Sequence, residues 1–276
     1  MNIPADGPRI EPARSPSQPD ARPPTARRRK RLVTALAICV GVIFVFAVGC
    51  SSVERKLLFF PTHHSVDNGL RPWTKAGALI GFAREVHSPR NVWLLLHGNA
   101  GQASDRVYAL SSFSAEDSVF ILEYPGYGNR KGRPSREAFN QAAQEAYLFL
   151  REEHTNVPVC VVAESIGSGP ACFLGAVKPA PDKLVLIVPF DQLSQVAKDH
   201  FPSILVSLVL RDNWDNVEAL SHYGGPVEIF GAERDAIIPI VHARALAATV
   251  PTSKLVVIQG GHNEWASQPK VAIRYP

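Results

Sequence analysis

The chain has 276 residues, of which 46% are hydrophobic, 20% charged and 8% aromatic. These proportions suit a globular protein with a full core and exclude disorder over most of the length. The formal net charge of +4 does not indicate a nucleic-acid groove, because residues 1–31 carry +5 and the remainder sums to −1. No short glycine or proline period is present, which excludes collagen-like and simple repeat proteins.

Residues 1–31 form a basic tail with seven prolines and no aromatic residue. Such a segment cannot bury enough apolar surface to fold, so we expect it to be disordered. The tail ends in the basic block 27–31, and residues 32–53 follow without a charged side chain. A basic block before an apolar run predicts an export or membrane-anchor signal whose basic end stays in the cytoplasm.

Residues 32–53 allow two main interpretations. In the first, Ala47–Cys50 is a lipobox, so that Cys50 is lipidated and becomes the mature N-terminus. In the second, the uncharged run stays as a transmembrane helix, since ~20 apolar residues span ~30 Å of hydrocarbon. A buried core helix is a third, weaker interpretation. Both main interpretations tether the predicted hydrolase domain, residues 54–276, to a membrane of the cell envelope on the non-cytoplasmic side.

After residue 55, continuous apolar runs alternate with helical patterns. Unbroken apolarity predicts strands that are covered on both faces, as in a parallel sheet. The predicted strands are 79–86, 91–96, 119–122, 157–163, 183–188, 227–230 and 254–258. This alternation predicts an α/β fold, with a mostly parallel central sheet, helices on both faces and active groups at the carboxyl ends of the strands.

The clearest predicted helix spans residues 135–154, with Ser135 as its N-cap. Its apolar residues recur at helical spacing and should form one buried face. They are Phe139, Ala142, Ala143, Ala146 and Leu150.

The strongest chemical motif is Val162–Gly167, where an apolar strand runs directly into Ser165 and a helix-compatible stretch follows. This order is typical of a nucleophile elbow, a tight turn that projects a serine hydroxyl above the sheet. The elbow needs small residues two before and two after the serine, and Ala163 and Gly167 occupy these positions. The alternative is an ordinary turn serine.

A serine becomes a useful nucleophile only when a base takes its proton. His262 follows the last predicted strand after two glycines, and Asp235 follows the preceding strand. We therefore expect Ser165, His262 and Asp235 to form a triad in which the carboxylate orients the imidazole. Glu233 and Asp191 are weaker candidates for the acid, and we favour a surface carboxylate and a solvated loop residue for them.

An oxyanion hole needs two backbone N–H donors aimed at the developing charge. Ile166, directly after the serine, should supply one of them. Asn99, in the glycine-containing loop 97–101 after a strand, should supply the other. His97 in the same loop is expected to brace it rather than to react.

The sequence indicates neither a metal nor an organic cofactor. No cysteine or histidine cluster has zinc-ligand spacing, and His63 and His64 lack a third ligand nearby in the sequence. Cys160 and Cys172 lie in apolar stretches and are expected to be buried thiols.

Together these residues resemble the α/β-hydrolases, and more narrowly the membrane-tethered abhydrolase-domain serine hydrolases. This branch includes eukaryotic acyl-protein thioesterases and many bacterial members. The matching segments are 56–62, 97–101, 124–128, 132–135, the Ser165 elbow, Arg234-Asp235 with Pro239, and 261–263. The resemblance implies Ser165, Asp235 and His262 as the triad and a serine-hydrolase activity.

Some segments depart from the family pattern. Glu123 stands where the family usually has aspartate, and residues 265–275 are too short and proline-interrupted for a long terminal helix. The lid position, 191–226, has room for two short helices rather than a large cap. Within it, residues 201–210 are apolar around most of a helix, so they are expected to line an acyl pocket, touch the membrane or pack on the sheet.

The sequence therefore predicts a membrane-tethered serine hydrolase that cleaves carboxylic esters or thioesters through an acyl-enzyme on Ser165. A serine peptidase on the same fold is the main alternative. A cell-envelope binding protein that has lost turnover is the non-enzymatic one, since a fold does not dictate a function.

Overall fold

The computed structural model describes residues 54–275. The predicted tail (1–31), the predicted signal or anchor (32–53) and Cys50 lie outside this range. None of the helices formed by residues 54–275 has the length and apolarity that a membrane span requires.

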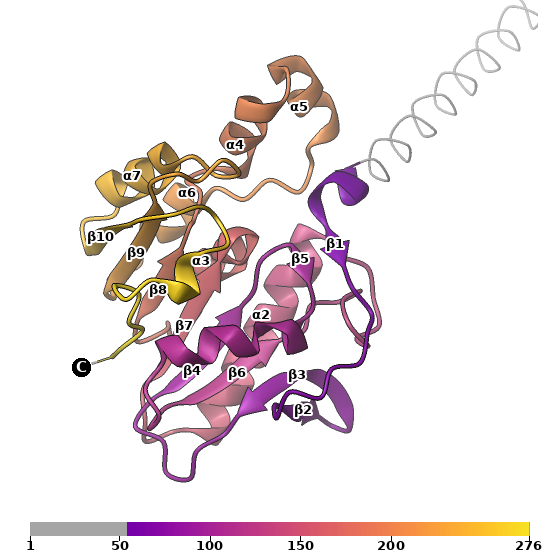
Figure 1. The fold of residues 1–276 in the computed structure, drawn as a ribbon, viewed down its shortest axis with the longest axis vertical. Helices are drawn as coiled ribbons and strands as arrows, with labels where there is room; N and C mark the ends of the chain where they lie inside the picture. Colours follow the sequence, from indigo (N-terminus) through magenta and orange to yellow (C-terminus); the bar gives the residue numbers. More distant parts are fainter. Residues whose placement is uncertain (1–53, 276) are drawn as a thin grey trace, which may run out of the picture. The chain divides into compact units, whose positions relative to one another are not determined.

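An eight-stranded sheet runs through the described part of the chain (Figure 1). In spatial order its strands are β10 (Ser253–Ile258), β9 (Val227–Ala232), β8 (Leu184–Ile187), β7 (Val159–Glu164), β4 (Val92–Leu96), β6 (Ser118–Leu122), β3 (Ala78–Arg84) and β2 (Arg71–Lys75). Neighbouring strands from β10 to β6 are parallel, whereas β3 pairs antiparallel with β6 and with β2. The mostly parallel α/β architecture predicted from the sequence is confirmed.

Each predicted strand is present, with ends that agree to within two residues. The sequence analysis missed β2 because it is an edge strand in which only Trp73 is buried. A polar strand with a single buried side chain gives no apolar run, and Pro72 further weakens the strand signal. A two-stranded parallel pair, β1 (Phe60–Pro61) with β5 (Ala100–Gly101), was also missed and joins the N-terminal segment to the loop after β4.

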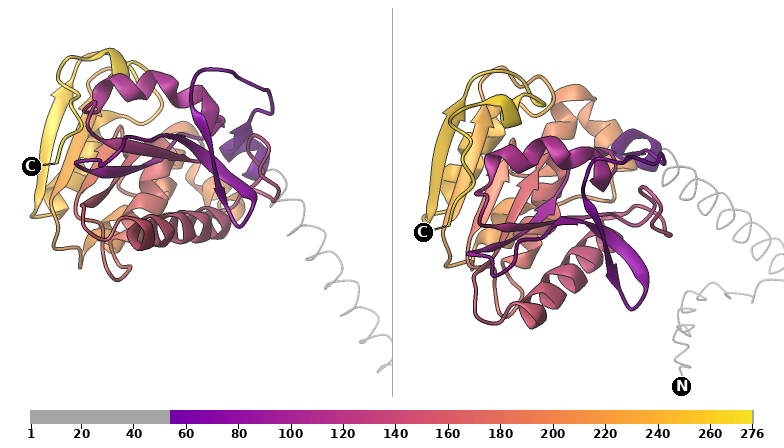
Figure 2. Two further views of the ribbon diagram at one scale, coloured as in Figure 1. Left: turned by 90° about the horizontal axis from the view of Figure 1, so that it is seen from below. Right: turned by 60° about the horizontal axis from the view of Figure 1, so that its bottom comes forward.

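Alternate side chains of the central strands belong to two separate cores. Along β4, Leu94 and Leu96 pack in the first core, whereas Trp93 and Leu95 pack in the second. The first core is covered by α2 (Arg136–Glu153), α3 (Ser168–Leu174), α6 (Asn216–Leu220) and α7 (Ile240–Thr249). The second is covered by the 3₁₀ helices η1 (Ala103–Ser112) and η3 (Trp265–Ser267) and by the segment after η3. Figure 2 shows α2 and η1 on opposite sides of the sheet.

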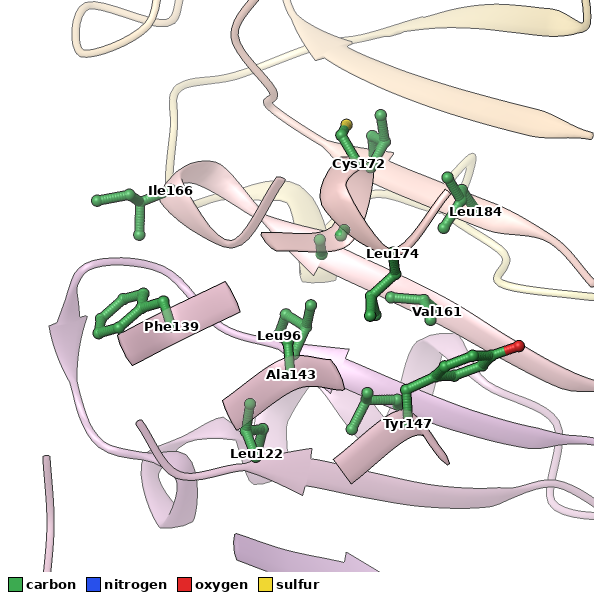
Figure 3. Packing of buried hydrophobic residues seen from close by; sticks show 14 of the residues in the cluster. Leu96, Leu122, Phe139, Ala143, Tyr147, Val161, Ile166, Cys172, Leu174 and Leu184 are labelled. Carbon is green, nitrogen blue, oxygen red and sulfur yellow. The ribbon is translucent and has the colours of Figure 1, made fainter. Parts of the chain in front are cut away.

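Helix α2 forms because its sequence meets the requirements for capping and burial together. The Ser135 hydroxyl accepts a hydrogen bond from the Ala138 amide at 3.1 Å, as expected of an N-cap. The predicted apolar face is buried, with Phe139 and Ala143 facing the sheet core (Figure 3). The Tyr124 ring stacks on Phe139 with a centroid distance of 3.8 Å. This pair fixes the turn after β6 against the helix.

Residues 191–226 contain three helices rather than the two expected: α4 (Leu193–His200), α5 (Ser203–Val209) and α6. Pro202 separates α4 from α5, and the Asp215 carboxylate caps α6 by accepting from the Glu218 amide at 3.0 Å. Residues 265–275 form no long helix, as expected. They contribute Trp265, Val271 and Ile273 to the second core.

Replacing Phe139 by alanine should lower the free energy of unfolding by about 3–5 kcal/mol, because it removes a fully buried ring that stacks on Tyr124. Urea unfolding followed by tryptophan fluorescence would measure the change. Gln141→Ala, at an exposed position of the same helix, should stay within about 0.5 kcal/mol of the wild type. Equal effects of the two substitutions would contradict this account of the core.

Candidate active site

Ser165 lies on a strained turn between β7 and α3. It follows the last residue of β7, and its φ of +55° is in the left-handed region that residues other than glycine rarely adopt. Such strain persists only where the surrounding structure enforces it, and it concentrates at functional sites. A Cβ atom at Gly167 would lie 2.2 Å from the Leu96 carbonyl oxygen. The elbow therefore requires glycine at 167, whereas Ala163 is accommodated within the buried strand.

His262 lies between Ser165 and Asp235. Its Nδ1 is 2.7 Å from Asp235 Oδ2, and its Nε2 is 2.9 Å from Ser165 Oγ. An ionised carboxylate can only accept, so the proton belongs on Nδ1, and the Ser165 hydroxyl then donates to Nε2. All three side chains are buried to more than nine-tenths. The structure thus brings together the three residues that the sequence analysis grouped as a triad.

The second carboxylate oxygen of Asp235, Oδ1, is held by backbone hydrogen bonds. Oδ1 accepts from the amides of Ile237 and Ile238, both at 2.8 Å. The Arg234 amide donates to the carbonyl of Gly260 at 3.0 Å, which couples the loop after β9 to the loop after β10. These bonds fix the carboxylate relative to His262 before any substrate binds.

Neither alternative acid contacts His262. Glu233 is exposed, and its carboxylate accepts from the Gln259 side chain at 2.7 Å. Asp191 instead lies 2.8 Å from Nδ1 of His242, whose Nε2 is 2.8 Å from Asp199. Asp191 is therefore part of a hydrogen-bonded network with His242 and Asp199 rather than the solvated loop residue that we expected.

An apolar cavity of about 370 Å³ opens on one side of Ser165. Its walls come from the loops after β8 and β9, from α4, and from the helical residues 54–58. Apolar side chains dominate it, among them Phe190, Leu193, Val196, Phe201, Ile237 and Ile238. This cavity suits an extended apolar group beside the serine hydroxyl.

A smaller polar cavity of about 120 Å³ lies on the other side, where Arg106, Glu164 and Asn263 join Ser165 and His262. Its polar groups are linked in a chain that the sequence analysis missed. Arg106 Nη1 donates to the Tyr108 hydroxyl at 3.1 Å, and this hydroxyl donates to Glu164 at 3.2 Å. The only sequence signal was Glu164 itself, a charged residue at the end of an otherwise apolar strand.

Protonation states follow from this environment. Burial, and then the neighbouring Glu164 carboxylate, raise the pKa of Tyr108, so its phenol stays protonated and able to donate. Burial opposes the charge on Arg106, but Glu164 and Tyr108 outweigh it and raise the pKa of the guanidinium. The cavity that Ser165 lines is therefore also lined by a lasting cation, Arg106, and by the acidic residue Glu164.

The two expected oxyanion donors border the cavities. Asn99 lines both of them, and Ile166 lines the apolar one. The Asn99 side-chain amide donates to the Leu58 carbonyl at 3.0 Å, and the backbone carbonyl of Asn99 accepts from the Tyr127 hydroxyl at 2.7 Å. These bonds hold the loop after β4 in place. His97, buried against the rings of Tyr124 and Tyr127, braces the same loop as expected.

Other sequence expectations concern cysteines and metals. Cys160 and Cys172 are buried free thiols, as predicted, and burial raises the pKa of both. Within residues 54–275, no group of three histidine, cysteine or acidic side chains is arranged to hold a metal ion. His64 pairs instead with Asp105, at 3.0 Å.

Comparisons with known proteins found relatives that cover most of the chain. No family model matches it. An uncharacterized protein of Mycobacterium tuberculosis strain CDC 1551 is 31% identical over 254 residues, covering 86% of this chain and 90% of that protein. The lysophosphatidylserine lipase ABHD12 of Danio rerio is 26% identical over 287 residues, covering 83% and 74%. Human alpha/beta hydrolase domain-containing protein 17B is 30% identical over 190 residues, covering 66% and 64%.

Solved structures agree in fold. The esterase Pf2001 of Pyrococcus furiosus superposes with a TM-score of 0.55 at 12% identity, covering 75% of this chain and 95% of that one. Est1E of Butyrivibrio proteoclasticus also gives 0.55 at 12% identity, covering 71% and 90%. At such identities the likeness concerns the arrangement of the chain alone.

Gly167→Ala should destabilise the elbow by about 1–3 kcal/mol, because the added methyl group would meet the Leu96 carbonyl and displace Ser165. Urea unfolding would measure the stability, and crystallography would report the displacement. Gly224→Ala is the matched control, since nothing lies within 4 Å of the added methyl group. A Gly167→Ala protein that is as stable as the control, with Ser165 unmoved, would refute the packing argument.

Proposed function

The chain belongs to the α/β-hydrolase superfamily, in its abhydrolase-domain branch, and from this premise we propose that it is a serine hydrolase cleaving carboxylic esters or thioesters. The observation that carries the proposal is the continuous hydrogen-bonded line from Asp235 through His262 to a strained Ser165. The relatives named as lysophosphatidylserine lipases support ester hydrolysis as the type of reaction.

In the proposed acylation step, Ser165 Oγ attacks the carbonyl carbon while Nε2 of His262 takes the hydroxyl proton. Asp235 keeps the imidazole in the required tautomer and stabilises the imidazolium. The tetrahedral intermediate collapses, His262 returns the proton to the leaving alcohol or thiol, and an acyl-enzyme remains on Ser165. Water then attacks the acyl group with the same proton transfers and releases the acid.

The negative charge on the tetrahedral oxygen needs preorganised donors. We assign this role to the backbone N–H groups of Asn99 and Ile166, because both residues border the space in front of Ser165. Removing one such donor typically costs ~10²–10³ in turnover, so the firm bracing of the Asn99 loop supports the assignment. The site requires no metal or organic cofactor for these steps.

The two cavities suggest how the substrate lies. The apolar cavity fits the acyl portion, since nothing in an alkyl chain requires a polar partner. The polar cavity, with Arg106 and Glu164, fits the leaving alcohol or thiol and any polar group that it carries. A peptidase would also use a serine, histidine and aspartate, but the largely apolar wall beside Ser165 favours an acyl chain.

A fluorophosphonate probe should label the wild-type chain at Ser165, because the hydrogen bond to His262 activates its hydroxyl. Ser165→Ala and His262→Ala should lose the label, whereas Ser111→Ala and His222→Ala, at exposed positions, should keep it. Labelling would be measured by intact mass and peptide mapping. An unlabelled but folded wild type would overturn the proposal and favour an envelope protein without turnover.

The same variants separate the two enzyme classes. A series of acyl esters and thioesters should be hydrolysed in a Ser165-dependent manner, and peptide amides with the same acyl groups should not. Preference for the amides would instead identify a peptidase.

We further propose that residues 32–53 tether the enzyme to a membrane of the cell envelope, with the hydrolase domain on the non-cytoplasmic side. The support is the uncharged run itself, preceded by a basic block. This tether is either a lipid on Cys50 or an uncleaved transmembrane helix.

Cys50→Ala should abolish metabolic labelling with a fatty-acid analogue if the tether is a lipid, because lipidation requires the thiol of that residue. Cys39→Ala, within the same uncharged run, is the matched control and should keep the label. A wild type that stays in the membrane fraction without any label would exclude the lipid and favour the transmembrane helix.

A further inference from the structure

Helix α5 exposes an apolar surface that is unusual for a helix facing water. Residues 201–210 contain no charged side chain, and within α5 only Val206 is buried. Ile204 is 73% exposed and Leu208 54% exposed. A helix on the surface of a soluble protein normally presents polar residues on its outer face. A contiguous apolar patch instead marks a surface that contacts another apolar phase.

This surface is continuous with the proposed active site. A groove lined almost entirely by apolar atoms lies between α5 and the helical residues 54–58, and Figure 1 shows these two segments near each other. The groove and the cavity at Ser165 share Leu57, Leu58, Ala197 and Phe201. An apolar path therefore leads from the exposed face of α5 to the serine.

Exposed apolar side chains from three segments line the groove or the cavity, or lie on the same short helix as residues that do, and we call them the apolar rim. Leu57, Phe201, Leu205 and Ile237 line the groove or the cavity, whereas Ile204 and Leu208 are exposed on α5. Leu57 and Ile237 are each 51% exposed although they line these hollows.

Glu54, the first residue that the structure describes, is hydrogen-bonded to the chain just after α5. The buried Glu54 carboxylate accepts hydrogen bonds from the amides of Arg211 and Asp212, both at 2.6 Å. These bonds hold residues 54–58 against the chain that follows α5, so that Leu57 stays beside the groove.

We propose that the apolar rim docks on the surface of a lipid bilayer, so that acyl chains pass from the lipid through the groove to the cavity at Ser165. The uncharged run 32–53 ends one residue before Glu54. Three residues lie between position 53 and Leu57, so four steps along the chain join them, a reach of at most ~14 Å. A bilayer that holds residues 32–53 is therefore within reach of the rim.

Charge at the edge of the rim agrees with a bilayer as its partner. Lys56, Lys198 and Arg211 are exposed beside the rim residues. Basic side chains that flank an apolar helix face are typical of interfacial segments, since they contact anionic headgroups while the apolar face enters the acyl boundary. Two acidic residues lie in the same stretches of chain: Asp199 contacts His242 at 2.8 Å, and Asp212 is half-buried.

The docking surface rests on the proposed membrane tether, but it is a property separate from the hydrolytic chemistry. It concerns how the domain lies on the membrane, and it would exist even if Ser165 were unreactive. Loss of docking would leave the proposed function intact, and loss of the fluorophosphonate label would leave the docking intact.

Tryptophan fluorescence in the full chain tests the proposal. The chain has four tryptophans, and Trp73, Trp93, Trp214 and Trp265 are all buried, which gives a constant background. Ile204→Trp would be reconstituted in vesicles of phosphatidylcholine and phosphatidylglycerol, with and without bromine in the acyl chains. We expect the bromine to quench roughly half or more of the added fluorescence, because an interfacial helix buries its apolar face ~5–10 Å into the lipid boundary.

Glu152→Trp is the control, since Glu152 is exposed near the end of α2 that leads into β7, away from Ser165. It should show no bromine quenching although the same tether holds the protein on the same vesicles. Leu208→Trp is a second probe of the rim and should be quenched like the first, which guards against a folding defect in either variant.

Two results would overturn the proposal. Unquenched, red-shifted emission at positions 204 and 208 would mean that the rim faces water. Unquenched, blue-shifted emission would mean that the rim is covered by residues 32–53 or by a second copy of the chain.

Discussion

The close approach of two backbones at the end of β7 is the constraint on which the rest of the site depends. Only the three-residue turn 165–167 separates β7 from α3, and the chain can turn so tightly because Gly167 has no side chain to meet the Leu96 carbonyl. That approach forces Ser165 into a left-handed conformation and projects its hydroxyl beyond the carboxyl end of β7. The strain is sustained because β7 lies in the middle of a sheet buried on both faces, where the surrounding packing leaves no room for relaxation.

Parallel strands supply the partners of this serine. Because β7, β9 and β10 are parallel, their carboxyl ends lie at the same end of the sheet. The loops that follow them meet there although they are far apart in sequence. The Asp235 and His262 loops are joined by a backbone hydrogen bond, and Asp235 receives two further amides. Backbone groups therefore fix the carboxylate end of the line. Such preorganisation is what an enzyme of the proposed type requires.

The two cavities at Ser165 differ in character, and the proposed placement of the substrate rests on this difference. Helix α4 and the helical residues 54–58 supply an apolar wall to one cavity, whereas the loop after β4 and Arg106 of η1 line the other, and Arg106 donates to Tyr108. The apolar wall continues outward to the face of α5. Helices α4 and α5 therefore contribute to one apolar surface, which includes both the wall of the cavity at Ser165 and the proposed membrane contact.

The sequence by itself determined the strand order along the chain, the elbow and the three residues of the line, because each depends on local patterns. Apolar runs reveal buried strands, and small residues around a serine reveal a close backbone approach. The tertiary structure decided what depends on contacts between distant segments. Edge strand β2, the pairing of Asp191 with His242, and the Arg106–Tyr108–Glu164 chain leave no local signal, since each side chain is ordinary until the fold supplies its partner.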